Sequence, residues 1–346
     1  MGLLSPPDSP FAPPSFFYQL IFHPLTTCFT FFHHLFVYLR GPPYVPPKNR
    51  IPIRVVCISD THSKIPRHAL PKGDLLIHSG DLTNTGNLAS IQQSIDWLKT
   101  LQKPWYGSSD GFRHIVVVAG NHDSYFDERS RSPHDKRNTS AGRKLDWGKI
   151  IYLQHSAVKL PFPDDRRLKV YGAPHIPKCG GKEFAFQYNR GQDAWTDTIP
   201  DDIDVLVTHN PPKWHLDLPQ SGGLGDEFEL KEVWRVKPTL HAFGHVHSGH
   251  GKEAVWWDQS QTCYEEFLAA SYNKPVAQSA SHRLPLTELI DLPLFMRGIR
   301  MLVADIRGLL WTRLWGGARN GGYMVNGALT YQTTEKLYNK PQVIVL

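Results

Sequence analysis

The chain has 346 residues, of which 40% are apolar and 12% aromatic, so it can bury a sizeable core as one large domain or two smaller ones. The net charge of +6 fits an anionic substrate or a membrane surface, but it is too diffuse to predict nucleic-acid binding, and no nucleic-acid partner is expected. The four cysteines include no CxxC pair, which argues against a zinc knuckle or a disulfide framework and favours a reducing compartment.

Residues 1–49 are predicted to form an apolar N-terminal extension that ends in a stiff, proline-rich linker at 41–47. Residues 15–39 are strongly apolar and nearly reach the length of a transmembrane helix, about 20 residues. Pro24 and three histidines argue against a span, and the absence of a preceding basic region argues against a signal peptide. Membrane contact and a helix packed on the protein's own surface both stay open. Basic residues follow from Arg40, so a membrane-associated chain would keep its remainder on the cytoplasmic side.

From residue 50 onward, short β-branched runs predict a folded α/β domain. These runs are too short for buried helices and are typical of parallel strands that are covered on both faces. One helix is predicted over 88–101, where apolar residues recur at helical spacing. The predicted strands lie within residues 54–60, 74–80, 114–119, 150–153, 168–172, 204–209 and 240–244, with a return to the sheet at 325–330 and 342–346.

Residues 261–321 are predicted to be an insertion in this domain, which otherwise covers 50–260 and 322–346. Within residues 284–315, the helical periodicity separates an aliphatic face from a basic one. Such a helix has the form of a basic amphipathic helix lying on a membrane, and a helix docked on the domain with its arginines in solvent is the alternative. The aliphatic face holds Ile299, Leu302, Val303, Ile306, Leu309 and Leu310, and the basic face holds Arg297, Arg300 and Arg307.

Polar side chains follow five of the predicted strands, at the edge where an open α/β sheet places its chemistry. Gly120 is expected to allow a tight exit from the third of these strands through a positive φ. Mixed nitrogen and oxygen ligands suit Mn²⁺, Fe or Zn²⁺, and seven candidates suit two ions that share a carboxylate. The candidate metal ligands are Asp60, His62, Asp81, Asn121, His209, His245 and His247.

The order of these motifs resembles that of the calcineurin-like metallophosphoesterases, whose signature is Asp-x-His, Gly-Asp, Gly-Asn-His-Asp/Glu, His and Gly-His-x-His. The resemblance covers residues 52–258 and the closing strand at 341–346. It implies a four-layer α/β/β/α sandwich with a binuclear metal centre. Several segments are closest to the animal brain metallophosphoesterase-domain-containing proteins, namely residues 59–62, 76–83, 170–174, 207–212 and 339–344.

The resemblance also implies a role for each candidate. His122 matches the general acid of the family, and the intact His245 favours an active enzyme. Residues 80–86 lack the phosphate-gripping arginine of protein Ser/Thr phosphatases, which makes a phosphoprotein substrate doubtful. In the implied centre, Asp60, His62 and His247 hold one metal, Asn121, His209 and His245 hold the other, and Asp81 bridges them.

These features predict a phosphodiesterase that hydrolyses a small nucleotide-like ester by attack of a metal-bridging hydroxide. Two ions about 3.5–4 Å apart, Mn²⁺ or else Fe or Zn²⁺, would acidify a shared water and clamp the attacking and leaving oxygens. His122 would protonate the leaving alkoxide. His175 and His250 are predicted to contact the substrate. The alternatives are a non-catalytic nucleotide- or metal-binding scaffold of the same fold, and a phosphoesterase acting on phospholipid head groups at a membrane surface.

Overall fold

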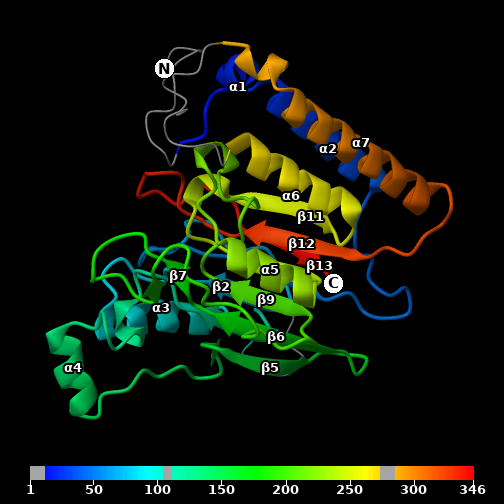
Figure 1. Cartoon of the computed structure of the whole chain (residues 1–346). Coiled ribbons are helices and arrows are strands. Elements are labelled where there is room, and N and C mark those ends of the chain that lie inside the picture. Colours follow the sequence, from blue (N-terminus) through cyan, green and yellow to red (C-terminus); the bar gives the residue numbers. More distant parts are fainter. Residues whose placement is uncertain (1–11, 104–110, 273–284) are drawn as a thin grey trace.

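The computed structural model describes residues 12–103, 111–272 and 285–346, and in these residues two β-sheets pack face to face (Figure 1). Within the same residues, β7 (Ile176–Pro177) and β8 (Gln187–Tyr188) form a separate parallel pair. The first sheet has, in spatial order, β13 (Gln342–Val345), β1 (Arg54–Ile58), β2 (Leu75–Ser79), β3 (His114–Val118) and β4 (Ile151–Tyr152). The second has β11 (Gly251–Trp256), β12 (Gly321–Asn326), β10 (Leu240–Phe243), β9 (Val205–Thr208), β6 (Arg167–Ala173) and β5 (Ser156–Pro161).

The central strands of both sheets run parallel. In the first sheet β1 pairs with β2, and β2 pairs with β3, while in the second sheet β9 lies between β6 and β10. Two strands from the end of the chain complete the sheets. Arg54 of β1 pairs with Val345 of antiparallel β13, and β12 lies between β10 and β11. The polar segments that follow the parallel strands therefore leave their sheets at carboxyl ends, where a site can form.

Branched aliphatic side chains fill the space between the two sheets. Val55 and Val116 of the first sheet and Val170 and Val207 of the second belong to one buried cluster. Strands β2 and β9 are buried at every position, as expected for strands covered on both faces. Burying one such side chain stabilises the fold by about 1.5–3 kcal/mol, so this cluster holds the sheets together.

One helix covers the outer face of each sheet. α3 (Leu88–Thr100) begins at Asn87, whose side chain accepts a hydrogen bond from the Ser90 amide, and it packs its apolar face on the first sheet. α5 (Glu227–Val236) begins at Asp226 in the same way and packs Val233 on the second sheet. The predicted four-layer α/β/β/α sandwich is thus confirmed. The helix predicted over 88–101 is α3.

Four further helices form a helical layer beyond β11 (Figure 1). They are α1 (Phe16–Phe22), α2 (Pro24–Arg40), α6 (Gln259–Tyr272) and α7 (Leu292–Arg313). Phe29 of α2, Phe267 of α6 and Met301 of α7 share a buried apolar cluster. The remaining elements are α4 (Pro133–Ser140) and the short 3-10 helices η1 (Ser124–Phe126), η2 (Pro219–Ser221), η3 (His247–Gly249) and η6 (Thr287–Ile290).

Buried polar contacts tie α2 to the rest of the molecule. The Thr26 hydroxyl donates to Glu288 at 2.8 Å, and His33 Nδ1 lies 3.0 Å from Asp305. Arg40 pairs with Asp258 at 2.7 Å, with its guanidinium 3.8 Å from the centre of the Trp256 ring. The inner side of α2 is therefore held by specific partners.

Residues 1–11 of the predicted extension and 273–284 of the predicted insertion lie outside the described residues. Among the described helices, none alone has the length and hydropathy needed to cross a membrane. α1 and α2 reach the required values only as a pair, and this pair is bent by 119° at the break between them.

Candidate metal centre

The candidate ligands lie directly after the carboxyl ends of β1, β2, β3, β9 and β10. The side chains come from both sheets, so the site forms where the two layers of strands meet. Asp60, Asp81, Asn121 and His209 are buried, whereas His62, His245 and His247 are partly exposed.

Four of these residues have a left-handed backbone. The φ angles are 54° for Asp60, 47° for His62, 53° for Asp81 and 63° for His245. A residue other than glycine held in such a conformation costs on the order of 1–3 kcal/mol, and such residues gather at functional sites. The strained positions therefore coincide with the residues that the sequence motifs selected.

Glycines permit the close approach of these segments. A Cβ at Gly120 would collide with the Asp81 carboxylate and the His209 ring, and a Cβ at Gly244 would collide with the Asp60 carboxylate. Gly120 was expected to adopt a positive φ, but it is not among the residues that do. This expectation was wrong, because the position needs a glycine for lack of space around Cβ.

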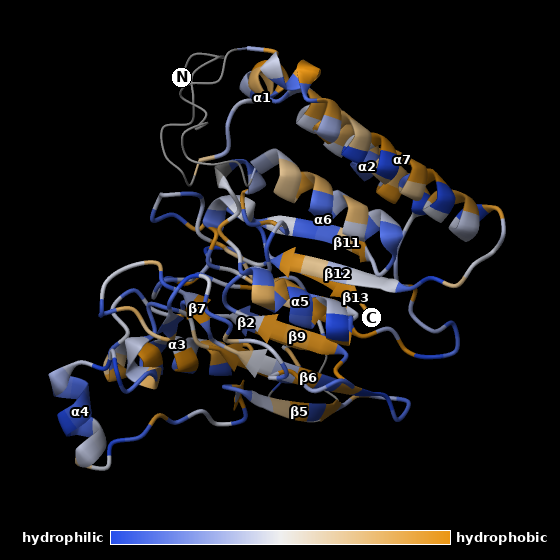
Figure 2. Ribbon diagram, in the orientation of Figure 1, coloured by the Kyte–Doolittle hydropathy of each residue, from blue (hydrophilic) through white to orange (hydrophobic). Residues whose placement is uncertain are grey.

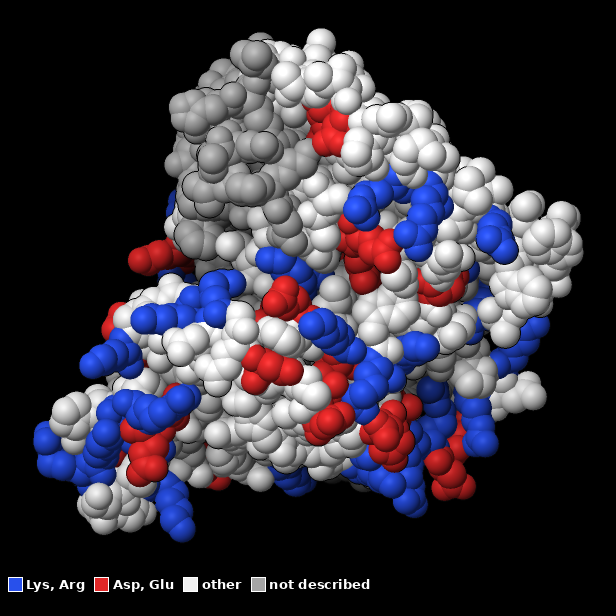
Figure 3. All heavy atoms as spheres, in the orientation of Figure 1, with Lys and Arg blue, Asp and Glu red and all other residues white. Residues whose placement is uncertain are grey.

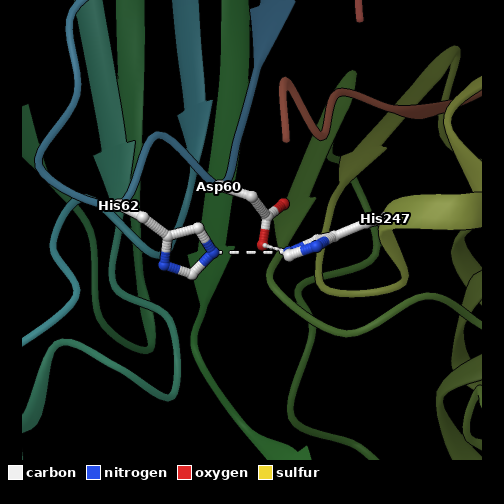
Figure 4. Close-up of side chains that lie close together, drawn as sticks. All are labelled: Asp60, His62 and His247. Atoms are coloured by element: carbon white, nitrogen blue, oxygen red, sulfur yellow. Dashed lines mark hydrogen bonds and ion pairs between the residues drawn. The ribbon is translucent and has the colours of Figure 1, made fainter. Parts of the chain in front are cut away.

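Asp60, His62 and His247 converge on one point (Figure 4). His247 Nε2 lies 3.3 Å from Asp60 Oδ1 and 3.3 Å from His62 Nε2. His247 Nδ1 lies 2.9 Å from the Gln332 carbonyl oxygen and must donate to it, since a carbonyl only accepts. In the neutral ring Nε2 then carries a lone pair, which faces an acceptor oxygen and a second imidazole.

His209 repeats this arrangement on the other side of Asp81. Its Nδ1 donates to the Ser79 carbonyl oxygen at 2.8 Å. Its Nε2 lies 3.0 Å from Asn121 Oδ1 and 3.5 Å from Asp81 Oδ1. Two atoms that both carry lone pairs repel each other at these distances unless a proton or a cation lies between them. This set of nitrogen and oxygen ligands therefore fits bound metal ions.

Asp81 lies where the two groups meet. Its carboxylate belongs to one group of converging donors with Asp60 and His209, and to another with His62 and His122. Within each group all donor atoms lie within 4.8 Å of one another. This is the position that the sequence resemblance implies for a bridging ligand.

The electrostatics of the cluster favour a cation. Burial alone would raise the pKa of Asp60, but its hydrogen bond to His247 and the nearby histidine charges lower it well below the usual range. Burial alone would lower the pKa of His247, but the bond to Asp60 and the Asp60 charge outweigh it and raise the value to about 9. Two buried carboxylates thus attract positive charge, which divalent ions can supply.

His245 lies at the margin of the cluster. Burial, followed by the charge of His209, lowers the pKa of His245 to about 3, so the ring is neutral and able to offer a lone pair. Its ring centre is 5.2 Å from that of His209, and its amide donates to Asp60 at 3.1 Å. His245 is absent from the three groups of converging donors found among the described residues.

His122 lies beside the cluster with its ring oriented by backbone contacts. Its amide donates to Asp81 Oδ1 at 2.8 Å, and its Nδ1 lies 3.2 Å from the Asn84 carbonyl oxygen. The ring packs edge-on against His62 and Phe184, with both ring centres 4.9 Å away. With Nδ1 donating to Asn84, Nε2 is left for substrate or metal.

Two small hollows flank His122 and His247, which line both. One of about 250 Å³ has an apolar wall that includes Phe184 and Leu224, and the other, of about 200 Å³, is polar and includes Asn84. Sequence reasoning did not identify these wall residues as part of the site, and Phe184 and Leu224 lie in loops without motifs. Gln332 and Thr333, from the loop between β12 and β13, line both hollows as well.

The structure does not bring His175 and His250 to the cluster. The ring of His175 packs 4.1 Å from that of His155 and 5.9 Å from that of Trp195, and His250 Nε2 lies 2.8 Å from the Lys340 carbonyl oxygen. Neither lines the two hollows. Their predicted contact with substrate therefore stays a prediction without structural support.

The sequence is similar to a known protein family and to several known proteins. Residues 53–249 match the sequence model of a family described as "Calcineurin-like phosphoesterase". "Probable rhamnogalacturonate lyase C" of Emericella nidulans is 41% identical over 218 residues, which are 62% of this chain and 19% of that protein. "Metallophosphoesterase domain-containing protein 1" of Homo sapiens is 32% identical over 228 residues, which are 60% of this chain and 65% of the relative. A UPF0046 protein of Caenorhabditis elegans is 35% identical over 212 residues, which are 58% and 70% of the two chains. The chain thus spans less than two thirds of the fungal and human relatives.

Proposed function

Because the chain belongs to the calcineurin-like phosphoesterase family, we propose that it is a phosphodiesterase acting on a small nucleotide-like ester at a centre of two divalent ions. The family and the cluster of candidate ligands support a metal-dependent phosphoesterase. When bound, the ions would supply an acidified water and neutralise charge on the phosphoryl oxygens. The nitrogen and oxygen donor set suits manganese, with iron or zinc as alternatives. In the proposed centre, Asp60, His62 and His247 hold one ion, Asn121, His209 and His245 hold the other, and Asp81 contacts both.

The observation that carries this proposal is the meeting of acceptor atoms at the strand ends. His209 and His247 each use Nδ1 to donate to a backbone carbonyl, which directs a lone pair on Nε2 into the cluster. Such contacts fix the ring orientation of metal-binding histidines in proteins. Without metal, the His209 Nε2 lone pair would face the Asn121 and Asp81 oxygens, and His247 Nε2 would need a proton to bond to Asp60.

The two hollows support a diester rather than a monoester. A diester carries two organic groups on one phosphorus. His122 lines both hollows, so one group could occupy the apolar hollow and the other the polar hollow. Phe184 and Leu224 would contact an apolar or aromatic group, whereas Asn84 and Lys64 would contact a hydroxylated one. Volumes of about 250 and 200 Å³ suit small groups and do not suit a folded phosphoprotein.

His122 is proposed to deliver the proton that the leaving alkoxide requires. The Asn84 carbonyl holds Nδ1, so the mobile proton would be carried on Nε2. A general acid positioned in this way contributes typically 10²–10⁴-fold to the rate.

The experiment combines a substrate panel with metal analysis. Manganese-loaded protein should hydrolyse bis(p-nitrophenyl) phosphate and cyclic nucleotides faster than p-nitrophenyl phosphate. Purified protein should contain close to two ions per chain, and Asp81→Ala should lose both ions and the activity, whereas the exposed, remote His134→Ala should lose neither. A preference for monoesters would refute the diester proposal. A content near one ion that is unchanged in Asp81→Ala would refute the shared centre.

A further inference from the structure

We propose that α1, α2 and α7 form a docking face for an anionic lipid bilayer, on which the protein lies without crossing it. The docking face is defined by the exposed apolar side chains of these three helices. It lies outside residues 53–249, which match the phosphoesterase family, so that match does not account for it. The inference is independent of the proposed substrate and metals.

An apolar strip runs along the exposed side of α7. Val303 is 50% exposed, Ile306 43% and Trp311 56%, although all three belong to a helix that packs on the protein. α1 and α2 add exposed aromatic and aliphatic side chains, so hydrophobic segments run along the outer edge of the molecule (Figure 2). The exposed apolar residues are Phe16, Phe17, Leu20, Phe31, Phe32, Leu35, Tyr38, Leu39, Leu292, Phe295, Met296, Ile299, Val303, Ile306, Leu310 and Trp311.

The inner side of α7 fixes this orientation, because it carries small and polar residues matched to α2. A Cβ at Gly298 would approach the Phe29 ring to 2.5 Å, so only glycine permits this contact. Asp305 is fully buried and lies 3.0 Å from His33 Nδ1. Turning α7 to bury its aliphatic side would expose Asp305 and break its contacts, so the apolar residues remain outside.

The exposed charges on these helices have one sign. Among the described residues of α1, α2 and α7, every exposed charged side chain is an arginine, because Asp305 and Arg40 are buried. Basic side chains gather on one flank of α7 beneath a mostly uncharged outer edge (Figure 3). The exposed arginines are Arg297, Arg300, Arg307 and Arg313.

At 100° per residue, Arg300 and Arg307 lie together along one side of the strip formed by Ile299, Val303 and Ile306. This arrangement suits lipid, since a helix in the headgroup region buries its apolar strip and extends arginines sideways to phosphates. A second copy of the chain fits less well, because a symmetric dimer would bring the same arginines together with no acidic partner on the face. Arg300 pairs with Glu266 at 3.0 Å and Arg313 Nε donates to the Leu39 carbonyl oxygen at 2.8 Å, which leaves Arg297 and Arg307 for phosphate groups.

The contacts on the inner side of α2 argue for lying on the bilayer rather than spanning it. Thr26, His33 and Arg40 are buried against Glu288, Asp305 and Asp258, respectively. Extraction of α2 into a membrane would break all three contacts and place Arg40 in hydrocarbon. The 119° bend between α1 and α2 likewise prevents one straight segment of sufficient length.

Vesicle sedimentation of the full chain tests the proposal. The protein should sediment with vesicles of phosphatidylcholine and phosphatidylserine (about 7:3), more weakly with phosphatidylcholine alone, and less in high salt. Val303→Gln/Ile306→Gln/Leu310→Gln should weaken the partitioning at least about tenfold, since each side chain loses buried apolar area. Ile51→Gln/Ile65→Gln/Val345→Gln, which alters exposed apolar residues elsewhere, should bind like the parent.

The arginines are tested separately. Arg297→Gln/Arg307→Gln should weaken binding to the anionic vesicles about fivefold per arginine and leave binding to neutral vesicles unchanged. The proposal is overturned if the parent protein stays in the supernatant with anionic vesicles at low salt. It is also overturned if the two apolar triple variants lose binding equally, or if light scattering shows a dimer that only the α7 triple variant dissociates.

Tryptophan fluorescence gives a second measurement that does not depend on the folding of the triple variant. Brominated lipid should quench part of the emission of the parent protein, and Trp311→Phe should reduce the quenched part, since Trp311 is exposed at the margin of the docking face. Quenching that is absent from the parent, or that is unchanged in Trp311→Phe, would contradict the proposal.

Discussion

The cluster of candidate metal ligands and the docking face both hold side chains in environments that are energetically unfavourable for them. At the strand ends, Asp60 and Asp81 are buried, which costs free energy unless positive charge compensates them. On α7, Val303 and Ile306 are exposed although an aliphatic side chain is more stable when buried. In both regions the neighbouring contacts hold the side chains in place, so the unfavourable surroundings mark what each region binds. We propose that cations satisfy the first region and that lipid satisfies the second.

The largest expected effect comes from a substitution that should lower activity without changing vesicle binding. His122→Ala should lower the rate of diester hydrolysis by roughly 10²–10⁴-fold, most for esters with poor leaving groups, because the proton donor is lost. Metal content and vesicle binding should stay the same. Steady-state kinetics with a series of substituted phenols measures this effect. If His122→Ala loses metal as Asn121→Ala does, His122 is a ligand and not the acid.

A pair of matched substitutions compares buried and exposed isoleucine. Ile95→Ala on α3 removes a fully buried side chain and should reduce the free energy of unfolding by roughly 2–5 kcal/mol. Ile299→Ala on α7 makes the same chemical change at a position that is 38% exposed, and it should stay within about 0.5 kcal/mol. Urea denaturation of both variants measures the difference. Equal losses would mean that the aliphatic side of α7 contributes to the core in solution.

The next comparison is between a buried arginine on the inner side of the helical layer and an exposed one. Arg40→Ala should reduce the free energy of unfolding by roughly 3 kcal/mol, since it removes one partner of a largely buried ion pair and the contact with Trp256. Arg313→Ala provides the control: this arginine is exposed and makes one hydrogen bond, to the Leu39 carbonyl oxygen at 2.8 Å, so its loss should change stability much less. Thermal melting of the two variants tests this. A loss in Arg313→Ala as large as that in Arg40→Ala would contradict the role given to burial.

The most gradual effect, small for each pH unit, concerns a buried histidine beneath α6. Burial alone would lower the pKa of His215, but the charge of Glu253 and the bonds to Glu253 and Glu265 raise it to about 10 from 6.5. The stabilisation is complete below pH 6.5 and is lost as the pH rises toward 10. The slope should reach about 1.4 kcal/mol per pH unit at most. Denaturation at several pH values should show this slope in the parent and a flatter profile in His215→Gln.

The candidate ligands at the strand ends could be predicted from the sequence, because each polar motif directly follows a run of β-branched residues. Asp60 and His245 lie three residues or fewer from a strand, so the fold alone brings them together once the sheets form. Phe184 and Gln332 could not be predicted as site residues, since long loops carry them to the cluster and no local pattern marks them. For α7 the periodicity separated aliphatic from basic residues, but it did not reveal that a third side, which carries Gly298, Met301 and Asp305, is the one packed on the protein. Gly298 decides this, because its lack of Cβ matters only once Phe29 lies beside it.

The pairing of β1 with β13 has a consequence for how the protein is synthesised. Arg54 and Val345 lie opposite each other in adjacent strands, yet almost the whole domain separates them along the chain. While translation proceeds, β1 has an open edge and β10 lacks the β12 strand that lies beside it. A fragment ending at residue 249 contains all seven candidate ligands but leaves both edges unpaired, and unpaired edges of this kind template aggregation. The segment recognisable by its motifs is therefore shorter than the segment that folds as a unit.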